Sequence, residues 1–183
     1  MFNKKLVTSE LVPDAHRLFS EIFPDEHLYE DGTLESCFSL SASQLHEEHD
    51  LWQYWIWYLS TSEVPMGMPI GMSGIYTEES DPESAWLGWL GVLPKFRRER
   101  FGTRMLNDFQ QEARERGFKF ARLYTNEGNL AARALYEFCG YTMERLSFDP
   151  PDYVKTGGDV IIYSRSLIEG QELVLWNNRP LAF

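Results

Sequence analysis

The sequence has few basic residues, few cysteines and no long apolar run, and each shortage excludes a class of protein. Its 17 lysines and arginines stand against 28 aspartates and glutamates, a formal net charge of −11, so we expect neither nucleic acid nor an anionic membrane as a partner. Cys37 and Cys139 are too few for a disulfide framework. No apolar run is long enough to cross a bilayer, and the first residues turn polar at Thr8. We therefore expect a soluble cytoplasmic protein.

The bulk composition is that of a globular domain. Hydrophobic residues make up 43% of the 183 residues and aromatic residues 15%, which is enough to bury a full core. We expect one domain across residues 1–183. His46 and His49 are three residues apart at a predicted helix end, but no third ligand is evident. We interpret them as a solvated terminus and expect no metal.

Hydrophobic periodicity predicts strands that alternate with helices. Strands are expected over 4–7, 51–60, 69–77, 86–93, 118–125, 141–148 and 159–167, and helices over 8–23, 33–49, 103–116 and 129–139. The short connections predict antiparallel pairing of 51–60 with 69–77 and of 141–148 with 159–167. The helix between 86–93 and 118–125 predicts a right-handed parallel crossover. No structure is assigned to residues 171–183.

Two of these strands have unusual compositions. Residues 51–60 are almost entirely aromatic or aliphatic, which predicts a strand covered on both faces, with one or two rings left to line a pocket. Gly88 and Gly91 interrupt the apolar strand at 86–93. A glycine inside a buried strand indicates a bulge or the close approach of another backbone or a ligand.

A basic turn follows the 86–93 strand and ends at a helix. Its five cations, in a chain that is otherwise acidic, are Lys95, Arg97, Arg98, Arg100 and Arg104. The free N–H groups of a turn and a helix start, together with the helix dipole and nearby guanidinium groups, form an anion site. A solvated basic face with a glycine turn is an equally good interpretation of these residues alone.

The segment from Val92 to Thr103 resembles the acetyl-CoA-binding motif of GNAT-type N-acetyltransferases. In that family a strand ends in Val-x-Pro and is followed by an aromatic residue and Arg/Gln-x-x-Gly-x-Gly/Ala before a helix. Arg97 matches the first position of this motif and Gly102 the last, whereas Arg100 stands where the family has its middle glycine. Arg100 either avoids left-handed geometry or loosens the loop, or its guanidinium reaches a phosphate such as that on the cofactor's ribose.

A second segment, 129–141, resembles the family's Asn-x-x-Ala-x-x-Leu-Tyr-x-x-x-Gly-Phe motif. Asn129 and Tyr136 occupy the positions that lie near the cofactor in that family, where the tyrosine often serves as general acid. A helical wheel independently puts the core stripe at Leu130, Ala131, Ala134, Leu135 and Phe138. Tyr136 falls on the other side, with Asn129, so we expect it outside the core; a plain surface tyrosine is the alternative.

The resemblance covers about residues 52–165 and implies a fold and a reaction. The fold would be a three-layer α+β domain with a mixed, mostly antiparallel, twisted sheet of about seven strands and a central parallel pair. The reaction would be direct transfer of an acetyl group from acetyl-CoA to a primary amine of a small molecule or protein, without a metal. The cofactor-binding residues implied are Val92, Arg97, Arg98, Arg100, Gly102, Thr103 and Asn129.

The roles in that reaction are expected as follows. Tyr136 would protonate the departing thiolate, a backbone N–H near Val92 would stabilise the oxyanion, and Glu83 is the expected base, with Glu78 and Glu79 left as alternatives. A homodimer is left open. A non-catalytic domain that senses acyl-CoA is the alternative function. A Rossmann-type nucleotide domain is disfavoured, because the turn lacks the first two glycines of Gly-x-Gly-x-x-Gly.

Overall fold

The computed structural model describes residues 1–24, 51–65, 67–145 and 160–178. The helix expected over 33–49, with His46 and His49 at its end, lies outside these ranges. Of the helices described, none combines the length and apolar character needed to cross a membrane.

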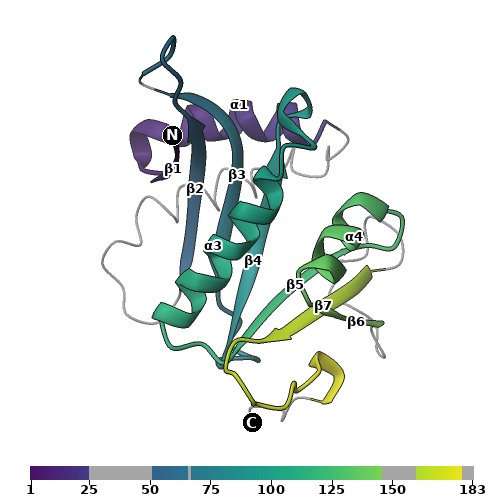
Figure 1. Cartoon of the computed structure of the whole chain (residues 1–183). Coiled ribbons are helices and arrows are strands. Elements are labelled where there is room, and N and C mark those ends of the chain that lie inside the picture. The colour runs from purple at the N-terminus through teal and green to yellow at the C-terminus, as the bar shows by residue number, and fades with distance from the viewer. Residues whose placement is uncertain (25–50, 66, 146–159, 179–183) are drawn as a thin grey trace. The chain divides into compact units, whose positions relative to one another are not determined.

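The predicted order of strands and helices is confirmed within the described residues (Figure 1). The elements are β1 (Phe2–Leu6), α1 (Val12–Ile22), β2 (Trp52–Leu59), β3 (Met68–Tyr76), β4 (Ser84–Val92), α3 (Phe101–Glu115), β5 (Phe120–Asn126), α4 (Leu130–Phe138), β6 (Thr142–Arg145) and β7 (Val160–Ser166). They build a seven-stranded sheet in the order β1-β2-β3-β4-β5-β7-β6. The β4–β5 pair is parallel, and the β1–β2, β2–β3, β5–β7 and β6–β7 pairs are antiparallel. The mixed, mostly antiparallel sheet is therefore as expected.

The chain forms two compact units. The first consists of residues 1–76 and 88–106, and the second of residues 77–87 and 107–183. Strand β4 and helix α3 each contribute to both units, so the division runs through these two elements.

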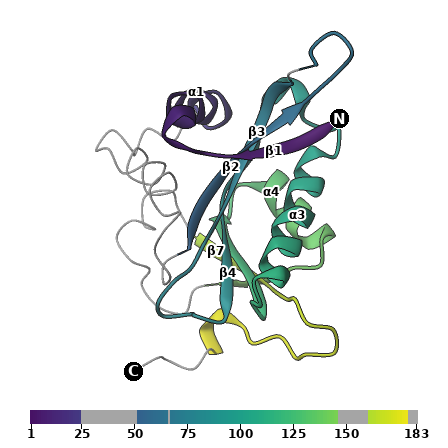
Figure 2. The same cartoon turned by 90° about the vertical axis from the view of Figure 1, so that its left-hand side faces the viewer.

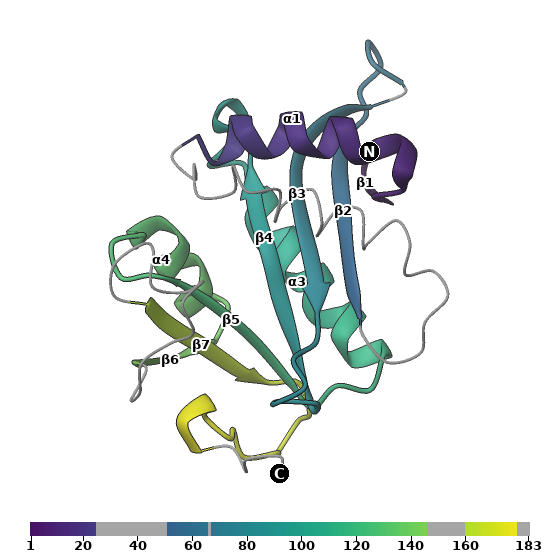
Figure 3. The same ribbon diagram turned by 180° about the vertical axis from the view of Figure 1, so that it is seen from behind.

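In the first unit, helices cover both faces of β2 and β3 (Figures 2 and 3). Tyr54 and Ile56 of β2 point to one face, where they pack with the buried side of α1: Ala15, Leu18, Phe19 and Ile22. Trp57 points to the other face, where it packs with Phe101 and Met105 of α3. This alternation explains the apolar composition of β2, since a strand covered on both faces needs apolar residues at every position.

The second unit is built around a buried ion pair. The guanidinium of Arg122 on β5 is 1% exposed, and its Nε donates to Asp81 Oδ2 at 2.7 Å. Its Nη1 donates to the Ser164 hydroxyl of β7, which in turn donates to Glu144 of β6. This chain of bonds satisfies the buried charge and ties the turn before β4 to three strands of the unit.

Glu144 also determines where the C-terminal segment lies. Its carboxylate, 6% exposed, accepts hydrogen bonds from the backbone N–H groups of Trp176 (2.7 Å) and Asn177 (3.0 Å). The Trp176 indole packs edge-on against Trp86 of β4, with ring centroids 4.9 Å apart. A carboxylate at the start of the short 3₁₀ turn Trp176–Asn178 is favourable because it pairs with free N–H groups.

Two ion pairs at the start of β4, one buried and one exposed, test how burial affects the contribution of an ion pair to stability. Replacing Asp81 with alanine should lower the free energy of unfolding by about 3 kcal/mol, because it leaves the Arg122 charge buried without its carboxylate. Replacing Glu83, which pairs with Lys119 in solvent, should lower it by less than about 1 kcal/mol. Urea unfolding of both variants measures the difference. Equal losses would show that burial does not determine the strength of these pairs.

Candidate functional site

The basic turn between β4 and α3 adopts left-handed backbone geometry. After Val92, a short 3₁₀ turn (η4, Pro94–Phe96) leads into four residues that precede α3. Arg98 has φ of 70° and Arg100 has φ of 61°, values that glycine reaches freely and other residues at a cost of about 1–2 kcal/mol. Arg100 therefore adopts the conformation that a glycine would have at its position, so the first of the expected alternatives, that it avoids left-handed geometry, is wrong.

The turn presents backbone donors at the start of α3. The Arg97 N–H donates to the Pro94 carbonyl and the Arg104 N–H donates to the Arg100 carbonyl. The N–H groups of Phe101, Gly102 and Thr103 lie in the first turn of the helix, where no helical carbonyl precedes them. Left-handed residues followed by a helix start form a concave array of N–H groups that binds anions.

The arginines of this turn differ in what they contact. Arg97 donates from Nε to the Val92 carbonyl at 2.9 Å and from Nη2 to the Ile22 carbonyl at 3.3 Å, and the guanidinium carbon of Arg104 lies 4.2 Å from the centre of the Phe2 ring. Arg98 and Arg100 are exposed, and within the described ranges no partner is found for either guanidinium. The guanidinium groups of Arg98 and Arg100 are thus available to bind an anionic ligand.

Strand β4 is distorted before it reaches the turn. Trp89 has φ of 39°, and its ring packs against Phe19 (4.8 Å between centroids) and Phe23 (5.4 Å) at the end of α1. At Gly88 an added Cβ would lie 2.9 Å from the Tyr54 hydroxyl, so the group that approaches this glycine is a side chain, whereas the sequence predicted a bulge, another backbone or a ligand. A positive φ within a strand marks a local irregularity of the kind found at β-bulges.

The packing of α4 differs from the prediction. Leu130 is 70% exposed and Phe138 82%, with Ala131 and Ala134 also exposed, whereas Tyr136 is 6% exposed. The predicted core stripe is therefore wrong and the expected position of Tyr136 outside the core is corrected. The helix has small or apolar residues on both sides, so its own sequence does not determine which side is buried.

Partners on the neighbouring strand determine the orientation of α4. The Tyr136 ring packs 5.4 Å from Tyr163 of β7 and 6.2 Å from Tyr141. Around the Tyr163 hydroxyl, Arg133 donates from Nε at 3.3 Å and Glu137 accepts at 2.8 Å. The contacts with Tyr163, a residue distant in sequence, hold the Tyr136 side of the helix against the sheet.

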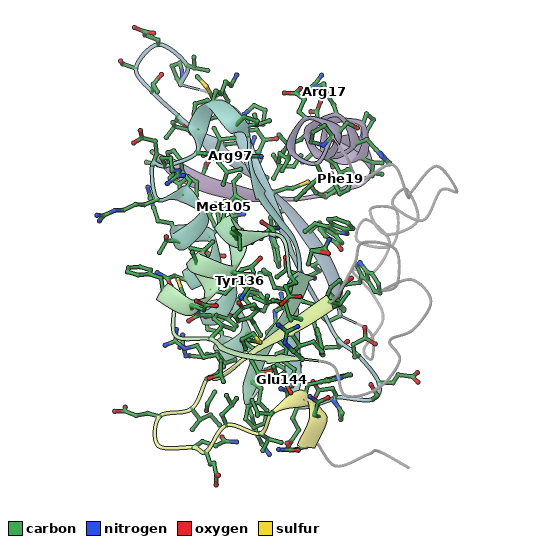
Figure 4. The ribbon with its side chains drawn as sticks, turned by 90° about the vertical axis from the view of Figure 1, so that its right-hand side faces the viewer. Arg17, Phe19, Arg97, Met105, Tyr136 and Glu144 are labelled. Carbon is green, nitrogen blue, oxygen red and sulfur yellow. The ribbon has the colours of Figure 1, made fainter. Side chains whose placement is uncertain are left out.

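Burial also changes the acidity of Tyr136, which is labelled on α4 in Figure 4. Desolvation raises the pKa of its phenol far above the ordinary value of about 10, and the nearby Tyr163 raises it further. At neutral pH the phenol is therefore fully protonated. It can donate a hydrogen bond or a proton, but it cannot act as a base.

Asn129 and Glu83 each make a contact within the protein. Asn129 is the N-cap of α4, and its side-chain oxygen accepts from the Ala132 N–H at 3.3 Å. Glu83 precedes β4, pairs with Lys119, and is separated from Val92 by about 30 Å of strand at about 3.3 Å per residue. No finding tests the predicted role of Glu83 as the base, or of Glu78 and Glu79 as its alternatives, and that role stays a prediction.

Among the described residues, no group of three or more His, Cys, Asp and Glu side chains could hold a metal ion. The loop residues Val92, Arg97, Arg98, Arg100, Gly102 and Thr103 all lie in the first unit. Glu83, Asn129 and Tyr136 lie in the second. The predicted loop residues therefore lie together in the first unit, and the predicted acid, Tyr136, belongs to the second.

The sequence profile of the acetyltransferase (GNAT) family matches residues 10–141. No curated protein matches the sequence significantly.

Several solved structures are similar in fold. A GNAT-family acetyltransferase described as putative, from Desulfovibrio desulfuricans, superposes with a TM-score of 0.72 at 13% identity, covering 92% of this chain and 100% of that one. The PaiA N-acetyltransferase of Thermoplasma acidophilum, in complex with coenzyme A, gives 0.65 at 15%, covering 91% and 99%. The ribosomal-protein-S18-alanine N-acetyltransferase of Escherichia coli gives 0.62 at 19%, covering 96% and 100%.

Proposed function

The chain belongs to the acetyltransferase (GNAT) family, and on that premise we propose that it transfers an acetyl group directly from acetyl-CoA to a primary amine. One observation carries the proposal. The turn between β4 and α3 combines a left-handed backbone, the free N–H groups of a helix start and two arginines without partners among the described residues. That arrangement suits the diphosphate of coenzyme A, which needs both oriented donors and opposite charge.

The cofactor would lie along the first unit from the turn toward the distortion in β4. The diphosphate would accept from the N–H groups of Phe101, Gly102 and Thr103, with Arg98 and Arg100 as charge partners. The pantetheine arm would pair with the backbone of β4 near Val92. A backbone N–H near Val92 would stabilise the negative charge that develops on the thioester carbonyl oxygen.

The chemistry then needs one attack and two proton transfers. The neutral amine attacks the thioester carbonyl, the carbon–sulfur bond breaks as the tetrahedral intermediate collapses, and the thiolate leaves. Tyr136 would give its proton to that thiolate and recover it from the ammonium through water. The predicted base, Glu83, pairs with Lys119, and we expect the amine to enter in its neutral form.

Ligand binding tests this proposal before any substrate is known. Coenzyme A or acetyl-CoA at about 100 times its Kd should add about 2.7 kcal/mol of stability, a rise in Tm of roughly 5–10 °C, whereas NAD at the same concentration should give none. A shift with NAD alone would contradict the proposal. Release of free thiol from acetyl-CoA across a panel of amines then separates an enzyme from an acyl-CoA sensor, which would bind without releasing thiol.

The substitution Arg100→Gly separates the backbone of the turn from its charge. Glycine should raise the free energy of unfolding by about 1 kcal/mol, because it adopts φ of 61° without strain. It should also weaken coenzyme A binding about tenfold, because one charge-assisted bond to phosphate is lost. Urea unfolding and calorimetry measure the two effects.

Two controls accompany the Arg100 experiment. Arg98→Gly, at φ of 70°, should behave in the same way, and a parallel titration with dephospho-coenzyme A tells which phosphate Arg100 binds. If affinity were lost for coenzyme A but unchanged for the dephospho form, the contact is with the ribose phosphate. Unchanged affinity for both would remove Arg100 from the binding site.

Tyr136→Phe tests the role of the general acid. Phenylalanine keeps the ring packing on Tyr163 and Tyr141, so the fold should be kept. The turnover number should fall by about 100-fold or more, because proton transfer in the transition state is lost, while coenzyme A affinity stays unchanged. Tyr141→Phe, in the same buried ring cluster, is the matched control and should keep full turnover. Equal turnover in both variants would exclude Tyr136 as the acid.

A further inference from the structure

Arg97 connects the turn before α3 and the end of β4 to the end of α1, a segment of the first unit that is far away in sequence. Its Nε donates to the Val92 carbonyl at the end of β4, and its Nη2 donates to the Ile22 carbonyl, 75 residues earlier in the chain. Figure 4 labels Arg97 and, on α1, Phe19 in the same upper part of the view. Two of its donors are thus directed at backbone carbonyls of the protein.

The carbonyl of Ile22 has a particular need for this partner. Ile22 is the last residue of α1, where helical carbonyls lack an N–H from a following turn and carry the negative end of the helix dipole. Helix α1 has no basic residue in its own last turn. Arg97 belongs to the turn between β4 and α3 (residues 94–100), called the cofactor turn below. It supplies the positive charge that the end of α1 lacks.

The end of α1 lies directly against the distorted part of β4. A Cβ added to Gly91 would overlap the side chains of Ile22 and Phe23, so only glycine leaves room for the helix end at this distance. Phe23, which follows α1, and Trp89, two residues before Gly91 in β4, have ring centroids 5.4 Å apart. Any shift of the α1 end would therefore be transmitted to the strand at Trp89, where φ is 39°.

From these contacts we propose that Arg97 is a positioning residue and not a phosphate ligand. Its guanidinium holds the end of α1 against β4, while Arg98 and Arg100 bind the phosphates. Arg97 thereby couples the cofactor turn to the shape of β4 beside the thioester. The inference rests in part on the proposed function, since it concerns the geometry of acetyl transfer.

The structural part of this inference can be tested without any cofactor. In the free protein, Arg97→Met should increase amide hydrogen exchange in the last turn of α1, including the Phe23 N–H that donates to the Phe19 carbonyl, by about tenfold, since a charged hydrogen bond is lost there. Arg98→Met makes the same change of charge one residue later and should leave this exchange unchanged. Equal exchange in the two variants and the parent protein would overturn the anchoring role.

Kinetics test the catalytic part. Arg97→Met should keep the Kd of coenzyme A within about threefold and lower the turnover number about tenfold or more, whereas Arg98→Met should raise that Kd about tenfold. Arg97→Lys should recover part of the turnover, because its ammonium can still reach a carbonyl. A loss of coenzyme A affinity in Arg97→Met equal to that of Arg98→Met, with normal turnover, would make Arg97 a phosphate ligand and overturn the proposal. Failure of the parent protein to bind coenzyme A would refute the proposed function instead, and the exchange experiment would remain valid.

Discussion

The turn that leads from β4 into α3 is the constraint on which the site depends. The chain must reverse from a strand into a helix within a few residues, and it does so with Arg98 and Arg100 in left-handed conformations. This geometry is unfavourable for a side chain with a Cβ, and it leaves the first N–H groups of α3 without helical partners. Strain and free donors at the same place are expected where the surroundings hold a functional conformation.

The charge distribution agrees with this geometry. A chain of net charge −11 concentrates cations in one turn and then uses them differently. Arg104 lies over the Phe2 ring, and Arg97 donates hydrogen bonds to two backbone carbonyls. Both arginines therefore contribute to the fold. Two further arginines are exposed and without partners among the described residues. Because exposed charges are weakly coupled to the fold, these two can be used for a ligand with little loss of stability.

Local signals in the sequence predicted the strands and helices, the parallel crossover and the position of the basic turn. They failed where the answer depends on distant residues. The buried side of α4 was predicted wrongly, because Tyr163, which packs on Tyr136, comes from another element. The position of the C-terminal segment depends on Glu144, and no local pattern marks that glutamate as a partner of Trp176.

Position within a motif also does not determine what an arginine does. Arg97 stands where the family motif has its first cation, yet its guanidinium contacts the carbonyls of Val92 and Ile22. Arg100 stands where the family has a glycine, yet it keeps the left-handed backbone and an exposed side chain. A left-handed backbone thus occurs here at an arginine, and the two arginines of the motif have different contacts. Since a phosphate is recognised by oriented donors and charge and not by residue identity, such an arrangement can bind the same cofactor and leave Arg97 to hold α1 in place.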